Sequence, residues 1–274
     1  RAPARAARLL RARPAAGAQA RVLARRLPSQ NAPRLSDPIA LARASFAQQA
    51  KWIDGPYGTA GLRAKVTEFF ARNVPARAGY QPVFFKGKIM LHGRQVGNFS
   101  RDYYYDYSTG ELVAHHAHLE IAPSIQGSGF AEQFNANLID WYRRSGIKQV
   151  RLSANIDVGG YAWARAGYAF ADQYGANDII SRLTALTDDL VNRRSSTLAD
   201  RLSGLDASEI QAQIQAAQAL LVRARQHPKF DDPLHPSAYE FSQLGRHTGQ
   251  GKDDMWIGKA AMLGSYWSAV LYLP

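Results

Sequence analysis

The segment HHAHLE (115–120) places residue types suited to proton transfer two positions apart. Alternate residues of a β-strand share a face, so His116, His118 and Glu120 are predicted to line one side of a strand. Such a group could take a proton from an amine or a hydroxyl, directly or through a water molecule. The other interpretation is that these are sheet residues without a catalytic role. A His-x-His pair also suggests a metal, but no third ligand is evident and no metal is predicted.

The next segment, LEIAPSIQGSGFA (119–131), leads from a strand pattern through a small-residue turn into a helix pattern. The N–H groups at the start of a helix, together with the helix dipole, favour a phosphate or a diphosphate. Gly127 and Gly129 would let an anion approach the backbone, Ser128 adds a hydroxyl, and Gln126 can donate its amide. No Lys-Ser or Lys-Thr follows, so this is not a Walker loop. A simple tight turn is the alternative.

Elements that could hold these residues follow from hydrophobic periodicity. Helices are predicted from Ser36 to about Trp52 and from about Ala60 to Arg72. Three strand-like runs then form an antiparallel meander, with turns near 92–93 and at 108–110. An antiparallel meander also argues against a dinucleotide fold, which needs a βαβ unit.

Helical periodicity takes over after Pro123. A helix is predicted to about Arg144, with Phe130, Phe134, Leu138, Trp141 and Tyr142 on its apolar stripe. A strand over 148–154 and a short helix ending at Gly167 follow, and then two helices over roughly 179–193 and 206–226. The segment 256–274 reads as a buried helix or strand that returns to the core.

The two chemical segments together resemble the acyl-coenzyme-A signature of the GNAT (Gcn5-related N-acetyltransferase) superfamily. The match runs from the strand at 119–123 to Gln126, Gly129 and Ala131. A second match is the strand VRLSA followed by Asn155 and a short helix that ends in Gly167-Tyr168. The resemblance covers about 83–170, roughly a third of the chain.

This resemblance implies an α+β fold with a mixed, mainly antiparallel sheet, a splayed pair of strands and flanking helices. It implies acetyl-CoA or another acyl-CoA as the acyl donor. The cofactor's pyrophosphate is then expected on the turn amides, and its pantetheine arm beside the backbone near Glu120, Ile121 and Ala122. Asn155 often contacts the cofactor in this family. By their closeness to the splay, Glu120 and His118 rank above His116 as the base. The predicted turn amides are those of Gln126, Gly127, Ser128, Gly129, Phe130 and Ala131.

The chain departs from the family at the general acid. Four residues before Gly167 the family usually has a tyrosine, whereas this chain has Trp163, whose indole cannot donate a proton to a thiolate. Tyr161 lies two residues earlier and would project from a different helix face. Either Tyr161 is the acid, or no acid is needed, or acyl transfer has been lost.

Composition bounds the remaining possibilities. The 274 residues carry a net charge of +12, and residues 1–36 hold nine arginines and no acid, which leaves about +3 (12 − 9) for the rest. Nucleic-acid binding is therefore expected, if anywhere, only in this basic arm, which could also be a linker or a targeting signal. The lack of cysteine excludes disulfides and thiol catalysis. No apolar run approaches the length of a membrane span.

Three regions are predicted: a basic arm over 1–35, a GNAT-like core over 36–175, and a mainly helical C-terminal extension over 176–274. The first function predicted is acyl transfer to an amine or hydroxyl of a protein or a small molecule. A second is a degenerate module that binds acyl-CoA or a protein partner, as part of a translocated effector or toxin. A third is an unrelated α+β interaction module. The start at Arg1 suggests a piece of a larger or exported polypeptide, and the sequence leaves the compartment open.

Overall fold

The computed structural model describes residues 53–58, 61–71, 83–106, 109–144, 146–154, 159–197, 199–247, 250 and 254–274. The basic arm, the helix predicted before Trp52, and Asn155 lie outside these residues. The strands are β1 (Gly55–Tyr57), β2 (Leu62–Ala71), β3 (Val83–Leu91), β4 (Arg94–Asp106), β5 (Glu111–Ile121), β6 (Gln149–Ala154), β7 (Ala169–Phe170) and β8 (Trp267–Tyr272). The helices are η3 (Pro123–Ile125), α4 (Phe130–Arg144), α5 (Gly159–Arg165), α6 (Gln173–Val191), η4 (Ala199–Leu202), α7 (Ala207–Gln226), α8 (Ala238–Gln243) and α9 (Ile257–Met262).

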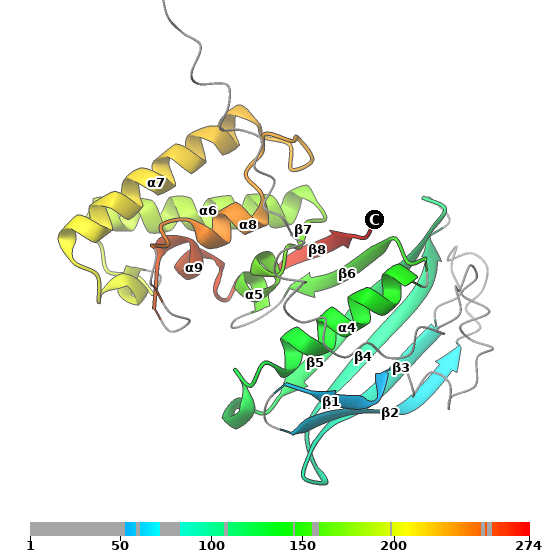
Figure 1. Cartoon of the computed structure of the whole chain (residues 1–274). Helices are drawn as coiled ribbons and strands as arrows, with labels where there is room; N and C mark the ends of the chain where they lie inside the picture. The colour runs from blue at the N-terminus through cyan, green and yellow to red at the C-terminus, as the bar shows by residue number, and fades with distance from the viewer. Residues whose placement is uncertain are drawn as a thin grey trace, which may run out of the picture. The chain divides into compact units, whose positions relative to one another are not determined.

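The strands are hydrogen-bonded in the order β1-β2-β3-β4-β5-β6-β8-β7, mainly antiparallel (Figure 1). The predicted α+β class with a mainly antiparallel sheet flanked by helices is therefore confirmed. The described residues form two compact units. The first holds the described residues up to Leu112 together with His118–Ile147, and the second holds Val113–Ala117 with Lys148–Pro274.

The helix predicted over 60–72 is wrong, because residues 62–71 form strand β2. Leu62, Ala64 and Val66 are buried while Arg63 and Lys65 are exposed, so the side chains alternate with the period of two of a half-buried strand. β2 pairs antiparallel with β3 and with the short strand β1. The two-residue period outweighed the helical propensity of this segment's Ala, Lys and Arg residues.

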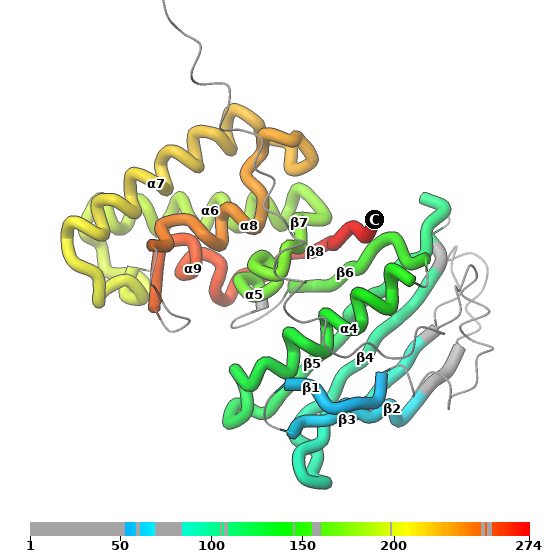
Figure 2. Tube along the Cα trace, viewed as in Figure 1, coloured from blue at the N-terminus to red at the C-terminus, as the bar shows by residue number. Residues whose placement is uncertain are grey.

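The predicted meander β3-β4-β5 and the helix after Pro123 are confirmed in the first unit. The chain turns from β3 into β4 at His92-Gly93. Figure 2 shows the trace of these two neighbouring strands. On α4 the five stripe residues predicted from the sequence are buried. Phe134 packs on Phe99 of β4 with ring centroids 4.9 Å apart, and Tyr57 of β1 meets Phe134 at 5.2 Å. α4 thereby covers one face of this part of the sheet.

In the second unit, β8 lies between β6 and β7 and pairs antiparallel with both (Figure 1). Helices α6 to α9 are therefore an insertion between β7 and β8, two strands that pair with each other, and the chain's last strand belongs to the sheet. The sequence predicted a mainly helical extension over 176–274 whose last part, 256–274, returns to the core as a buried helix or strand. α9 and β8 lie in that part, but the pairing of β8 between β6 and β7 was not predicted. Trp256 and Trp267 are fully buried, as packing residues are.

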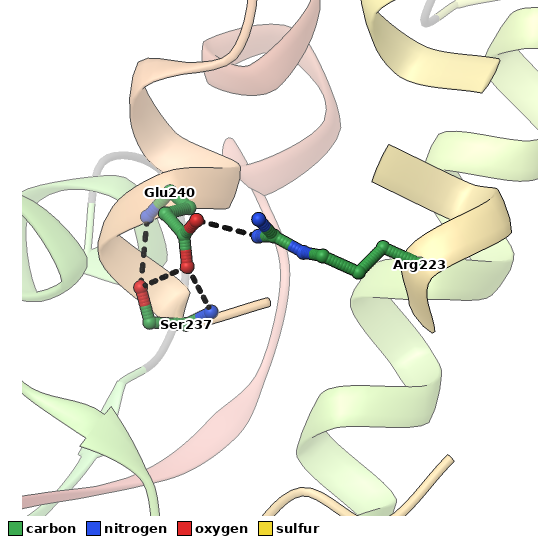
Figure 3. A network of polar contacts seen from close by, with 3 residues as sticks. All are labelled: Arg223, Ser237 and Glu240. Atoms are coloured by element: carbon green, nitrogen blue, oxygen red, sulfur yellow. Dashed lines mark hydrogen bonds and ion pairs between the residues drawn. The ribbon is translucent and has the colours of Figure 1, made fainter. Parts of the chain in front are cut away.

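Polar contacts fix the inserted helices to one another. Ser237 caps α8 by accepting from the N–H of Glu240, whose carboxylate accepts from the Ser237 N–H and from Arg223 of α7 (Figure 3). These bonds lower the pKa of Glu240, although burial alone would raise it. Among the described residues, none of the helices combines the length and the hydropathy needed to cross a membrane.

Candidate functional site

His118 and Glu120 point to the same side of β5, as the alternation predicts. The Nε2 atom of His118 lies 3.5 Å from Oε2 of Glu120, and the two side chains are 50% and 67% exposed. Asn98 of β4 donates from Nδ2 to the same carboxylate at 3.2 Å. The result is an accessible imidazole–carboxylate pair whose carboxylate is held by an amide from the neighbouring strand, which suits proton transfer to or from a bound molecule.

His116, the third residue of the pattern, has a different environment. It is buried, and its ring meets the indole of Trp163 on α5 at 6.2 Å between centroids. No group of three or more metal-ligating side chains comes together among the described residues. The three residues of the pattern therefore have different environments. His116 packs in the interior, whereas His118 and Glu120 form an exposed pair.

Arg101 of β4 fixes the backbone behind His118. Its side chain is fully buried, and Nη1 donates to the carbonyls of His118 and Ser100 while Nη2 donates to Oδ1 of Asn135 on α4 at 3.3 Å. The guanidinium also stacks 5.6 Å from the centroid of the Phe134 ring. Burial would be costly for a positive charge without such acceptors, and these contacts tie β4, β5 and α4 together at this point.

Two glycines let backbones approach this strand and the following turn. A Cβ at Gly97 of β4 would lie 2.2 Å from the carbonyl oxygen of Glu120, which only a glycine permits. A Cβ at Gly58, in the turn after β1, would lie 2.8 Å from the carbonyl oxygen of Ser128. The N–H of Gly58 also donates to Oε1 of Gln133 at 2.7 Å, so this turn supports the glycine loop from behind.

The loop between β5 and α4 is a tight, solvent-facing turn. Gln126 N–H donates to the Pro123 carbonyl at 3.2 Å, and Gly127 and Gly129 have φ of 80° and 78°. Gln126 and Gly127 are exposed, and Ser128 and Gly129 are half-buried. α4 then begins at Phe130, and the Gly129 carbonyl accepts from Gln133.

This loop fits an anion. The first N–H groups of a helix have no acceptor within the helix, and they carry the positive end of its dipole. A Cβ placed on Gly129 would meet no atom within 4 Å, so the space in front of this backbone is open. Within the predicted diphosphate seat, Gln126 and Gly127 are exposed, Ser128, Gly129 and Ala131 are half-buried, and the Phe130 side chain is buried in the core.

The amide of Gln126 has a further partner. Its Nε2 donates to the Ile121 carbonyl at 3.0 Å, which closes the loop onto the end of β5. Ala122 N–H donates to Val96 of β4, so by the alternation of a strand the groups of Ile121 face the other edge. Of the backbone groups predicted to receive the pantetheine arm, Ile121 faces this edge, whereas Glu120 and Ala122 face β4.

That second edge of β5 is paired over only a short stretch. β5 and β6 run parallel through Val113–His115 and Gln149–Arg151. In the part of the chain that the structure describes, no strand pairs with this edge after His115. β6 is matched to β5 only as far as Arg151, although it pairs with β8 through all of Gln149–Ala154. A strand with an unpaired edge can accept an extended ligand through its backbone.

Tyr161 and Trp163 face in different directions from α5. The Trp163 ring contacts His116 and Tyr168, whereas Tyr161 packs edge-on against Trp256 at 5.7 Å. The Tyr161 hydroxyl is buried and has no hydrogen-bond partner among the described residues. The position at which the sequence resemblance predicted an acid is thus occupied by Trp163, whose ring contacts His116 of β5, and Tyr161 lies on the other side of the helix.

Sequence reasoning missed the supporting residues Arg101, Asn98, Gly97 and Gly58. One signal existed: Phe99, Arg101 and Tyr103 alternate on β4, which places an arginine on a face that is otherwise aromatic and buried. The contacts of Gly58 with the loop join residues 70 positions apart in the sequence, so no local sequence pattern predicts them.

Neither a comparison with models of protein families nor one with curated protein sequences finds a match for this chain. A comparison with solved structures finds a likeness to nourseothricin acetyltransferase, with 14% identical residues and a TM-score of 0.26. The likeness covers 47% of this chain and 82% of that chain. This structural neighbour is thus an acetyltransferase, but at this TM-score the likeness does not by itself support a shared activity.

Proposed function

We propose that this protein is an acyltransferase that moves an acetyl or another acyl group from coenzyme A to an amine or a hydroxyl. The observation that carries this proposal is the open glycine loop at the start of α4, next to the exposed His118–Glu120 pair at the end of β5. The glycine loop suits binding of a diphosphate, and the His118–Glu120 pair suits proton transfer. Acyl transfer from coenzyme A requires both a diphosphate site and a proton acceptor.

The residues divide between binding and chemistry. The amides of Gln126 to Ala131 would hold the diphosphate of the acyl-CoA, with Gly127 and Gly129 giving the close approach and the Ser128 hydroxyl adding a donor. The edge of β5 at Ile121 would pair with the pantetheine arm. Asn155 stays a predicted contact of the cofactor.

Bound acyl-CoA supplies an activated acyl carbon with a thiolate as leaving group. The nucleophile bonds to that carbon as the bond to sulfur breaks, and its proton passes to the His118–Glu120 pair, directly or through water. Asn98 and Arg101 keep this pair in place, the first through the carboxylate and the second through the His118 backbone. Tyr161 stays a candidate for protonating the thiolate. Because its hydroxyl is buried and its ring packs against Trp256, we assign proton transfer from the nucleophile to the exposed His118–Glu120 pair.

A second candidate function is acyl-CoA binding without turnover. It is favoured by Trp163, because this indole next to His116 replaces a proton donor. Both functions require the same cofactor seat, so binding and turnover must be measured separately.

Thermal shift with acetyl-CoA tests the seat. A ligand that binds the folded state raises the melting temperature by mass action, and Gly129→Glu should abolish that rise by adding charge and bulk in the open space. Gly93→Glu is the matched control, since Gly93 also has a positive φ (81°) and open space but lies in the β3–β4 turn. An equal shift in both variants, or none in the wild type, contradicts the proposal. Thiol release with an amine panel then separates turnover from binding.

A further inference from the structure

Four exposed or half-buried polar side chains form a row across the first unit's sheet, on the face that carries the His118–Glu120 pair. Lys65 of β2 is the direct partner of Lys88 of β3, and Lys88 is the direct partner of Asn98 of β4. Asn98 in turn bonds Glu120 of β5. Directly opposed residues share a face, so the row runs continuously from two lysines to the proposed proton acceptor.

The two lysines break a rule of sheet pairing. Like charges placed directly opposite one another destabilise a sheet. The side chains of Lys65 and Lys88 make no ion pair or hydrogen bond to a described residue. Lys86, two residues from Lys88 on the same face, is in contrast paired with Glu68 at 3.4 Å. Sequences accept such local conflicts mainly where a site requires them.

The row has opposite charges at its two ends. Strands lie about 4.8 Å apart, so the Cα atoms of Lys88 and Lys65 are roughly 10 Å and 14 Å from that of Glu120. An acceptor lying along this row would meet a carboxylate and an imidazole at one end and two ammonium groups at the other. The face fits a molecule with an amine at one end and a negative group at the other.

We infer that the acceptor is an amine that also carries an anionic group, bound along this row. The inference rests on the proposed function: the amine lies at His118 and Glu120 for acylation, while Lys65 and Lys88 hold the carboxylate or phosphate. In the reaction the amine nitrogen bonds to the acyl carbon, the bond from that carbon to sulfur breaks, and the amine's proton goes to the His118–Glu120 pair.

Simple synthetic amines test this inference. 8-Aminooctanoate in its extended form has its amine and carboxylate roughly 10 Å apart, about the separation of Glu120 and Lys88 across two strand spacings, while 8-aminooctanamide is its neutral isostere. At low salt kcat/KM with acetyl-CoA should be about 3- to 10-fold higher for the carboxylate, the range expected for two exposed charge contacts. Screening by 0.5 M salt should reduce this preference.

Lysine variants test whether the preference for the carboxylate probe depends on Lys65 and Lys88. In Lys65→Met/Lys88→Met the ratio of the two probes should fall to about one. Lys86→Met is the matched control, since it also removes a lysine from this face, but one already paired with Glu68, and it should keep the wild-type ratio. A wild type that acylates both probes equally overturns the inference and leaves the acyltransferase proposal standing.

Direct measurement of probe binding tests the inference when neither probe is acylated. If the wild type binds acetyl-CoA but acylates neither probe, turnover fails, and calorimetric titration of 8-aminooctanoate and its amide decides the inference. Tighter binding of the carboxylate that is lost in the double variant supports the anion contact. Equal binding of both probes, or an unchanged preference in the double variant, overturns it.

Discussion

The imidazole of His118 approaches the carboxylate of Glu120 to 3.5 Å on the exposed side of β5, while the backbone of His118 is held from the buried side by Arg101. His118 thus has an exposed side chain and a backbone carbonyl that is hydrogen-bonded to a buried residue. Precise placement of a proton-transfer group requires such support, because small displacements reduce catalysis strongly.

Glu120→Gln and His118→Gln should each lower kcat by about 10²-fold or more, the range of general acid–base catalysis. Each change keeps a side chain of similar size but removes a proton acceptor. The acetyl-CoA thermal shift should stay at the wild-type value, because the glycine loop is untouched. Glu68→Gln removes another exposed carboxylate from the same face and should leave kcat unchanged. Full activity in both site variants would exclude the pair from the chemistry.

Arg101→Met should destabilise the fold by about 2–5 kcal/mol, because it leaves the buried acceptors of His118 and Asn135 unsatisfied. It should also lower kcat more than it raises the KM for acetyl-CoA, since it acts on β5 and not on the loop. Urea unfolding and steady-state kinetics measure the two effects. Arg101→Lys should recover part of kcat by restoring one donor. A change confined to stability would make Arg101 a core residue only.

Gly58→Ala should weaken acetyl-CoA binding by displacing the loop. A Cβ there comes within 2.8 Å of the Ser128 carbonyl, in addition to the strain of a positive φ (75°). Gly61→Ala isolates the strain: its φ is 70°, and its Cβ would meet nothing within 4 Å. The thermal shift produced by acetyl-CoA in each variant measures the difference. If the two alanine variants lose the same amount of shift, the turn does not support the loop.

Ser237→Ala should lower the free energy of unfolding by about 1 kcal/mol through the lost cap of α8, which urea unfolding measures.

Glu240→Gln should lower the free energy of unfolding by an amount that depends on pH. Burial raises the pKa of Glu240, but the bonds from Ser237 and Arg223 outweigh it and hold the pKa below its ordinary value of 4.5. Between the folded pKa and 4.5 the unfolded chain binds more protons, so stability falls as the pH falls. The difference in unfolding free energy between wild type and Glu240→Gln is therefore present at pH 7 and shrinks below about pH 4.5. A difference that does not change with pH would show that the charge of Glu240 contributes nothing.

The sequence alone determined the local pieces of this protein. The alternation in HHAHLE put His118 and Glu120 on one face, and the stripe beginning at Phe130 defined α4 and the glycine loop before it. These features depend on neighbours a few residues apart, and the periods of strand and helix reveal such relationships directly. The same logic failed at 60–72, where helix-forming residue types hid a two-residue alternation.

Tertiary structure decided the rest. Only strand pairing set Lys65, Lys88 and Asn98 in line with Glu120, and only close packing brought Gly58 to the glycine loop. The position of β8 between β6 and β7, after a long helical insertion, was likewise set by the sheet. Contacts between residues far apart in the chain depend on which surfaces meet when the core closes, and a one-dimensional period carries no record of that choice.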